Sequence, residues 1–352
     1  MKKLPASKLF DTAVSLFCAC GVPVDDAKIT ARELIEANLF GLDSHGFIRC
    51  IFYTQEIAAK RLIPGKAARI IKETPTTAVV DGQLNFGQVT AGKMVEVAAR
   101  KAKESHISCV VSQHAHHVGR LGAYTARLAE QGFLALAMCN GYKMGHFVAP
   151  YGGCEGRLAT NPFSYAVPGN EHPLVLDMST SMIAEGKIKV LLHEGKELPP
   201  ESVIGANGRE TREPAEFYGP PRGAILPFGG ALGYKGFGLG LMVEFFGGLL
   251  GGAELSDEYT YLNGLCLIAI DPEAFCGAEN FKSLLDNYSK YCKSARLAEN
   301  HREIIMPGEY DYAIRAVREK EGIPVPESVW NEIAAIADAH GLKLESYDDI
   351  EA

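Results

Sequence analysis

Apolar residues in the first part of the chain recur at helical spacing, with polar residues between them. Leu34, Ile35 and Leu39 share one face of such a pattern, while Arg32 and Glu36 lie on the other. The pattern breaks at a Pro-Gly pair near residue 64. It predicts helices over residues 6–20, 24–40 and 44–59, so residues 1 to about 74 are expected to be helical.

From residue 74 onward, short apolar runs alternate with helical patterns. The runs predict strands over residues 77–82, 107–111, 134–139, 164–167, 174–176 and 265–270, and the patterns between them predict helices over 89–105, 121–131 and 234–250. Helical patterns return over 279–299, 310–321 and 327–340. Alternating strands and helices predict an α/β layer. We therefore expect an α/β (α+β) fold with a central α/β domain over 75–275 and a discontinuous helical domain built from 1–74 and 276–352.

Composition narrows the class of protein. A chain of 352 residues with a net charge of −8 is long enough for two domains and lacks the basic surface that nucleic acid requires. No apolar run follows the N-terminal lysines, so no signal peptide is expected. Nine scattered cysteines without a C-x-x-C pair favour reduced thiols in a cytoplasmic protein. The glycine-rich segment 236–253 is interrupted by Glu244, which favours a tightly packed buried helix over a membrane span.

The segment 39–49 gathers several reactive side chains. Gly41 is a suitable helix stop, and Asp43 or Ser44 could cap a following helix that carries His45 in its first turn. Arg49 would then lie one turn further along the same face. A histidine that exchanges protons near neutral pH, beside an arginine that binds carboxylates, suits chemistry at an acid that carries a carbonyl. The alternative is a capped helix start with an exposed histidine and arginine.

Other motifs indicate ligand loops, and each is weak alone. The run His114-Ala115-His116-His117 has no accompanying cysteine or carboxylate cluster, so a ligand loop at a strand end is favoured over a metal site. The hydroxyl-rich run after Asp177 could donate to ribose or pyrophosphate oxygens, or could simply form an ST-turn. Residues 87–94 resemble a P-loop, but Met94 replaces the required hydroxyl, so a helix that starts at Gly87 is favoured. No G-x-G-x-x-G follows a predicted strand, which argues against an ordinary Rossmann domain.

Taken together, these motifs resemble the malate/L-lactate dehydrogenase type 2 family over nearly the whole chain. Within that family, the His-His-x-Gly-Arg loop and the C-terminal region resemble the hydroxycarboxylate dehydrogenase (hydroxyphenylpyruvate reductase) branch most. The matching stretches occur in family order and are Gly41-Leu42-Asp43-Ser44-His45-Gly46-Phe47-Ile48-Arg49, His116-His117-Val118-Gly119-Arg120-Leu121-Gly122, Leu158-Ala159-Thr160-Asn161-Pro162, Leu176-Asp177-Met178-Ser179-Thr180-Ser181, Gly233-Tyr234-Lys235-Gly236-Phe237-Gly238-Leu239 and Met306-Pro307-Gly308-Glu309.

The resemblance implies a non-Rossmann fold that binds NAD(P), with NADH favoured and no metal, in a homodimer whose active site lies near the subunit interface. It implies His45 as acid/base with Ser44 as its partner, and Arg49 and Thr160 on the substrate side. His117 is the rival acid/base, and Lys187 stands where some relatives place a catalytic relay. The implied cofactor contacts are Gly119, Arg120, Leu121, Asp177, Met178, Ser179, Thr180, Ser181, Tyr234, Lys235, Met306, Pro307, Gly308 and Glu309.

The implied reaction is reversible hydride transfer between the nicotinamide and a 2-oxo/2-hydroxy acid. One alternative from the same family is reduction of a cyclic 2-imino acid. Another is a dinucleotide-binding protein without activity, which the intact Ser44, His45 and Arg49 disfavour. Many members carry an arginine shortly before the Pro-Gly-Glu, where this chain has Ile304 and Ile305, so the sequence leaves NAD versus NADP open.

Overall fold

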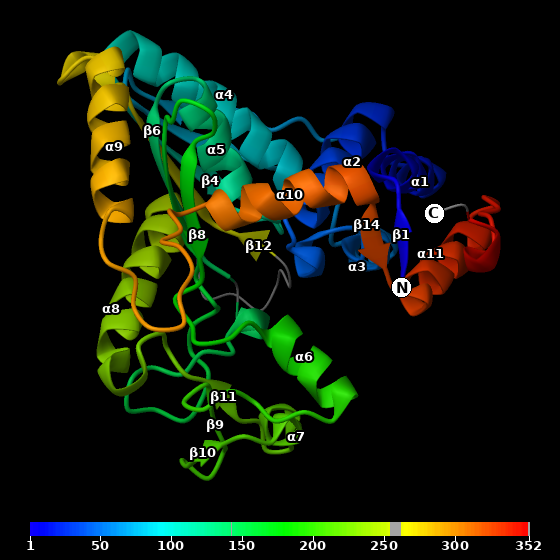
Figure 1. The fold of residues 1–352 in the computed structure, drawn as a ribbon. Helices are drawn as coiled ribbons and strands as arrows, with labels where there is room; N and C mark the ends of the chain where they lie inside the picture. The colour runs from blue at the N-terminus through cyan, green and yellow to red at the C-terminus, as the bar shows by residue number, and fades with distance from the viewer. Residues whose placement is uncertain (142, 254–261, 351–352) are drawn as a thin grey trace.

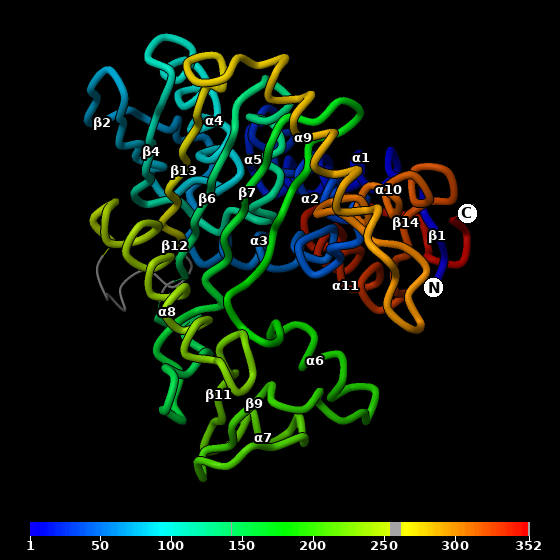
Figure 2. The backbone as a smooth tube through the Cα atoms, turned by 60° about the vertical axis from the view of Figure 1, so that its left-hand side comes forward, coloured from blue at the N-terminus to red at the C-terminus, as the bar shows by residue number. Residues whose placement is uncertain are grey.

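A seven-stranded mixed sheet forms the centre of the molecule (Figures 1 and 2). The computed structural model describes residues 1–141, 143–253 and 262–350. Only β3 and β4 pair in parallel, and every other neighbouring pair in this sheet is antiparallel. The strands in spatial order are β2 (Arg69–Glu73), β3 (Thr77–Asp81), β4 (Ile107–Gln113), β13 (Leu265–Ile270), β6 (Leu134–Cys139), β7 (Phe163–Val167) and β8 (Leu174–Met178).

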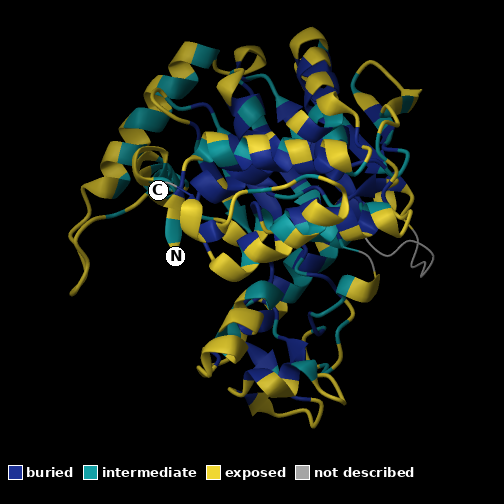
Figure 3. Ribbon diagram, turned by 90° about the vertical axis from the view of Figure 1, so that its right-hand side faces the viewer, coloured by how far each residue is buried: buried dark blue, intermediate teal, exposed yellow. Residues whose placement is uncertain are grey.

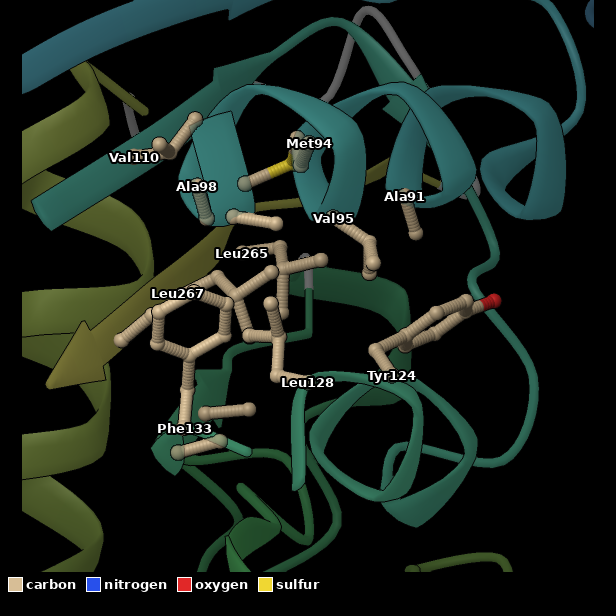
Figure 4. Close-up of a cluster of buried hydrophobic side chains, with 14 of the residues drawn as sticks. Ala91, Met94, Val95, Ala98, Val110, Tyr124, Leu128, Phe133, Leu265 and Leu267 are labelled. Atoms are coloured by element: carbon tan, nitrogen blue, oxygen red, sulfur yellow. The ribbon is translucent and has the colours of Figure 1, made fainter. Parts of the chain in front are cut away.

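Two helices cover one face of this sheet, α4 (Gly87–Ser105) and α5 (Gly122–Glu130) (Figure 1). Alternate residues of β13 point toward them, because successive side chains of a strand face opposite sides. Leu265 and Leu267 pack there against Met94 of α4 and Leu128 of α5 (Figure 4). This cluster is the core of the α/β part of the chain.

A second core joins the two ends of the chain. Its elements are α1 (Ala6–Ala19), α2 (Val24–Leu39), α3 (Arg49–Ala58), α11 (Glu327–Ala339) and the antiparallel pair of β1 (Lys2–Leu4) with β14 (Ile323–Val325). Phe17, Tyr53 and Trp330 are buried in it, and the backbone N–H of Lys2 donates to the Tyr347 hydroxyl at 2.6 Å. The helices were predicted. The strand pair that fastens the termini together was not, because its three-residue strands are too short to show a period.

A small third lobe hangs below the sheet in Figure 1 and has its own buried cluster around Ile188, Val203 and Phe217 (Figure 3). No element of this lobe is predicted from the sequence, because strands of two residues carry no usable pattern. The lobe contains α6 (Glu185–Glu194), β9 (Val203–Ile204), β10 (Glu210–Thr211), α7 (Pro214–Tyr218) and β11 (Ala224–Ile225). One further short pair joins β5 (Ala115–His116) to β12 (Leu262–Asn263).

The glycine-rich helix differs from its prediction. Helix α8 covers only Gly233–Val243 and continues as a π-helical turn over Glu244–Gly248. Gly233, Gly236 and Gly240 of this helix are buried, and a Cβ on Gly236 would collide with the Phe228 carbonyl. The prediction of a buried helix is wrong for its outer side, where Met242 is 44% exposed. Among the described residues, no helix is long and apolar enough to cross a membrane.

Two other predictions need correction. Residues 69–73 were expected to be helical but form strand β2, whose isoleucines lie at the edge of the sheet. Helix α9 (Ala278–Lys293) was expected to form a helical domain together with residues 1–74. It has no buried residue and lies beside the sheet in Figures 1 and 2, away from the helices at the N-terminus. Helix α10 (Glu309–Glu321) instead packs on α2 and so connects the sheet side to the second core.

Candidate functional site

The segment that carries His45 is a tight turn and not the start of an α-helix. Helix α2 ends at Leu39, a 3₁₀ turn covers Asp43–His45, and α3 begins only at Arg49. The prediction of His45 in the first turn of α3 is therefore wrong. The physical reason is Asn38, whose side-chain oxygen accepts from the Phe47 N–H at 2.7 Å and leaves no room for a Cβ at position 46. This contact forces the chain to bend before α3 can begin.

The turn brings two histidines together. The rings of His45 and His117 stack with centroids 5.7 Å apart and planes 21° apart. Ser44 Oγ lies 3.0 Å from His45 Nδ1, and Arg49 Nε donates to the Ser44 carbonyl at 2.6 Å. Burial, together with the Arg49 charge, lowers the pKa of His45 to about 3 and holds the pKa of His117 well below its usual value. Both imidazoles are therefore neutral at pH 7.

Two buried residues behind His117 complete this group, and neither was predicted from the sequence. The Tyr53 hydroxyl lies 2.9 Å from His117 Nδ1, and Gln88 Nε2 donates to that hydroxyl at 2.5 Å. Burial raises the pKa of Tyr53 to about 12, so it stays protonated. Tyr53 follows Arg49 by four residues on one helix face, a spacing that could have identified it. Gln88 lies in α4, and nothing in its local sequence pointed to the site.

The neighbouring histidines have separate partners. His114 Nδ1 lies 3.0 Å from an Asp81 carboxylate oxygen, while the buried His116 lies 3.5 Å from Glu56. Gly87 starts α4, as predicted, and a Cβ at this position would collide with the His116 carbonyl oxygen. Among the residues that the structure describes, no group of three or more histidine, cysteine or acidic side chains could hold a metal ion.

Two of the residues expected to contact a dinucleotide, Arg120 and Asp177, lie together at the start of α5. The Arg120 guanidinium lies 3.8 Å from the Phe40 ring centroid, and its buried Nε has no hydrogen-bond partner in the described part of the chain. Asp177 accepts from the Gly122 N–H at 2.7 Å. Burial raises the pKa of Asp177, although the Arg120 charge and the Gly122 bond oppose this. A buried arginine nitrogen without a partner beside a helix N-terminus suits an anionic ligand.

The segment Met306–Glu309 lies against the strand that leads to Asp177. The Val175 N–H donates to the Pro307 carbonyl at 3.2 Å, and Gly308 has a φ of +89° directly beside Val175. Glu309 accepts from the Met306 N–H at 2.8 Å, which closes the segment into a turn. Two stretches more than a hundred residues apart in sequence are thus brought together.

The loop after Asp177 uses its hydroxyls internally. Ser179 donates to the Ser181 carbonyl at 3.3 Å, and Thr180 donates to the Asn161 carbonyl at 3.1 Å. The Thr180 N–H donates to the Thr160 carbonyl at 3.0 Å, which joins this loop to the expected substrate-side residue. In these bonds the hydroxyls donate to carbonyl oxygens, so they are not the hydroxyl-to-N–H bond of an ST-turn, and a ligand would meet a loop that is already fixed.

Three further expected residues lie at the edges of the site. Tyr234 and Lys235 are exposed in the first turn of α8, next to the Phe228 segment, which is hydrogen-bonded to Thr180. Lys187 is exposed in the first turn of α6. The Cβ position of its neighbour Gly186 is 3.7 Å from Ser44 Cβ, so this helix start adjoins the Asp43–His45 turn.

Comparison with known proteins gives one consistent result. The family model for malate/L-lactate dehydrogenase matches residues 4–334. The L-sulfolactate dehydrogenase of Methanocaldococcus jannaschii is 36% identical over 335 residues, which cover 93% of this chain and 94% of that protein. Hydroxycarboxylate dehydrogenase B of Escherichia coli is 32% identical over 354 residues, which cover 98% of this chain and 96% of that protein.

Solved structures agree with this result. Sulfolactate dehydrogenase from Methanocaldococcus jannaschii superposes with a TM-score of 0.90 at 33% identity and covers 99% of this chain and 100% of that chain. A Δ1-piperideine-2-carboxylate reductase from Pseudomonas syringae superposes with a TM-score of 0.82 at 26% identity, covering 96% of this chain and 100% of that chain. The non-Rossmann α/β fold described above is thus the fold of these enzymes.

Proposed function

The chain belongs to the malate/L-lactate dehydrogenase family, and from this premise we propose that it interconverts a 2-oxo acid and its 2-hydroxy acid with NAD(P). The observation that carries the proposal is the neutral histidine pair beside Arg49. A 2-oxo acid needs one group that holds its carboxylate and one that moves a proton at its carbonyl oxygen. The turn at Asp43–His45 and the start of α3 supply both.

Arg49 holds the substrate carboxylate. Its Nε is used by the Ser44 carbonyl, and its two terminal nitrogens have no hydrogen-bond partner among the described residues. A guanidinium held in this way presents two parallel N–H groups, which match the two oxygens of a carboxylate. His45 lies one turn away and donates the proton to the carbonyl oxygen in reduction, with Ser44 bonded to its Nδ1. Thr160 and the charge of Lys187 complete the substrate side.

The cofactor contacts form two groups. When bound, the dinucleotide supplies or accepts the hydride. Arg120 would hold a cofactor oxygen through the buried Nε that otherwise has no partner in the described chain. In this proposal the rest of the cofactor site is formed by Gly119, Leu121, Asp177-Met178-Ser179-Thr180-Ser181, Met306-Pro307-Gly308-Glu309, Tyr234 and Lys235.

A second candidate is the reduction of a cyclic 2-imino acid. The likeness to the Δ1-piperideine-2-carboxylate reductase structure favours it, with a TM-score of 0.82. The same groups would serve, because an imine nitrogen next to a carboxylate presents nearly the same shape and also needs a proton. The two candidates differ only in which atom receives that proton.

Substrate tests decide between them. We would measure NADH and NADPH oxidation by the purified chain with pyruvate, oxaloacetate, phenylpyruvate, hydroxyphenylpyruvate, 2-oxoglutarate, sulfopyruvate, diketogulonate and piperideine-2-carboxylate. Turnover of a 2-oxo acid, with the imine slow, is the expected result. A preference for the imine would establish the second candidate. No turnover with any compound, despite NADH binding, would refute both.

We also propose that the chain is a homodimer that associates through the outer side of α8 and the turns after it. Five large apolar residues of this segment are more than 40% exposed, a patch rarely left open on a monomer; they are Met242, Phe245, Phe246, Leu249 and Leu250. A second copy covering them would also come near Tyr234 and Lys235 at the start of α8. Analytical ultracentrifugation tests this, since Phe246→Glu should yield monomers while the outlying Phe275→Glu should not. A monomeric wild-type chain would contradict it.

A further inference from the structure

We propose that Gln88 and Tyr53 hold His117 in the tautomer with its proton on Nε2, so that His117 donates a hydrogen bond and His45 alone carries the substrate proton. The inference rests on the proposed function, because it assigns different roles to two histidines of the same site. It rests structurally on a chain of two hydrogen bonds among buried side chains. Gln88 and Tyr53 are both completely buried, so no water competes for these groups.

The order of donors along these two hydrogen bonds fixes the tautomer of His117. Gln88 Nε2 can only donate, and it donates to the Tyr53 hydroxyl oxygen at 2.5 Å. The single hydroxyl proton of Tyr53 has two acceptors within reach, His117 Nδ1 at 2.9 Å and the His117 carbonyl oxygen at 3.5 Å, and the shorter contact assigns it to Nδ1. A neutral imidazole carries one proton on its two nitrogens. That proton of His117 is therefore on Nε2, the nitrogen that faces away from Tyr53.

The surroundings of His117 keep it neutral. The charged and titratable groups that act on it are Arg49, His45 and His116, and each of them opposes a second proton on the ring. Burial acts in the same direction. In this state His117 has no free nitrogen lone pair toward the substrate and cannot accept a proton there. It can stabilise negative charge that develops on the carbonyl oxygen by donating its N–H.

His45 has a different partner. Ser44 Oγ, 3.0 Å from His45 Nδ1, belongs to a hydroxyl that can rotate to donate or to accept. His45 can therefore exist with a proton on either nitrogen or on both. In reduction, NAD(P)H would supply the hydride to the substrate carbon. His45, neutral at rest, takes up a second proton from water and gives its Nε2 proton to the oxygen, so that it returns to the neutral form with Nδ1–H donating to Ser44.

The tautomer can be measured directly on the full-length chain by ¹⁵N-histidine NMR, with the His117 signals assigned by their loss in His117→Gln. We expect a protonated Nε2 and an unprotonated Nδ1 for His117. Gln88→Glu should reverse this, because a carboxylate accepts the Tyr53 proton and the Tyr53 oxygen then accepts from Nδ1–H. Gln88→Leu and Tyr53→Phe should remove the preference. Tyr124→Phe, which removes a buried hydroxyl bonded to the Val118 carbonyl of the same loop, should leave it unchanged.

Turnover gives the second readout. His117→Gln keeps an N–H donor and should retain kcat within about tenfold, whereas His45→Gln should lose it by about 10²–10⁴-fold. A wild-type His117 protonated on Nδ1, or equal losses in the two variants, would overturn the inference. If no compound turns over, the NMR result still decides the tautomer, so failure of the proposed function and failure of this inference remain distinguishable.

Discussion

The Arg318 guanidinium, in the C-terminal helix α10, binds both carboxylate oxygens of Asp43, at 2.6 and 3.0 Å. Asp43 precedes His45 by two residues, so this ion pair fastens the Asp43–His45 turn from 275 positions away in the sequence. Arg318 also donates to the Asn38 carbonyl at 2.5 Å, and Asn38 donates to Asp43 at 2.6 Å. The arrangement makes α10 part of the support for His45.

Loss of this clamp should affect catalysis more than folding. Because Asp43 is 48% exposed, Arg318→Met should cost only about 1 kcal/mol in the free energy of unfolding. A turn that can shift by a fraction of an ångström should nevertheless lower kcat by about tenfold or more. Kinetics and urea unfolding measured on the same samples test this. Lys320→Met is the control, since Lys320 is exposed on the same helix. Equal kcat in the two variants would show that the clamp does not position His45.

Substitution of Arg49 should affect the substrate and not the cofactor. In Arg49→Lys a single ammonium cannot bond the Ser44 carbonyl and also match both oxygens of a carboxylate. We expect the KM for the oxo acid to rise by about 10- to 100-fold, while the Kd for NADH is unchanged. Steady-state kinetics and fluorescence titration give the two numbers. A parallel loss of NADH affinity would mean that Arg49 does not bind the substrate.

Substitution of Arg120 should affect the binding of the cofactor and not of the substrate. If its buried Nε binds a cofactor oxygen, Arg120→Met should raise the Kd for NADH by about 10-fold or more. Arg315→Met is a matched control, because Arg315 lies 5.1 Å from the same Phe40 ring but forms its ion pair with Glu319 near the surface. The substrate KM, measured at saturating NADH, should change little in either variant. Similar NADH affinities in both variants would remove Arg120 from the cofactor site.

Local patterns predicted most helices and the central strands, because these elements are long enough to show a period. They placed Leu265–Ile270 correctly, and α10 and α11 to within one residue at each end. They failed where a long-range contact decides the local structure. The helix expected from Ser44 is interrupted because Asn38 bonds the Phe47 backbone, and no window of sequence shows that contact.

Some residues of the candidate site could likewise be predicted from the sequence, and others could not. His45 and Arg49 are recognisable because their types and spacing suit the chemistry, and Ser44 and His117 were expected from the family resemblance. The relation of Tyr53 and Gln88 to His117 depends on how α3 and α4 pack, so it became visible only in the fold. The role of Arg318 could not be predicted either, since it follows from the position of α10 and not from the local sequence around Arg318.

The histidine pair predicts how stability depends on pH. Unfolded histidines take up protons near pH 6.5, while His45 and His117 in the folded chain do not, because their pKa values are lowered by burial and by Arg49. Below pH 6.5 the unfolded state therefore binds more protons than the folded state. The free energy of unfolding should decrease as the pH is lowered in that range. Urea unfolding between pH 7.5 and about 5 measures this slope. His45→Gln and His117→Gln should each flatten it by up to about 1.4 kcal/mol per pH unit, and an unchanged slope would contradict neutral folded histidines.

Two glycines of α4 provide the last prediction. A Cβ on Gly87 would collide with the carbonyl oxygen of His116, next to His117, whereas a Cβ on Gly92 would have nothing within 4 Å. Gly87→Ala should therefore displace the histidine loop, lower the free energy of unfolding by about 1–3 kcal/mol and reduce kcat. Gly92→Ala should raise the free energy of unfolding by about 0.5–1 kcal/mol, because alanine is the better helix former, and should leave kcat unchanged. Since both changes add one methyl group to the same helix, only the close approach of His116 can produce opposite signs. Equal effects in urea unfolding would mean that α4 does not pack on the His116–His117 backbone as described.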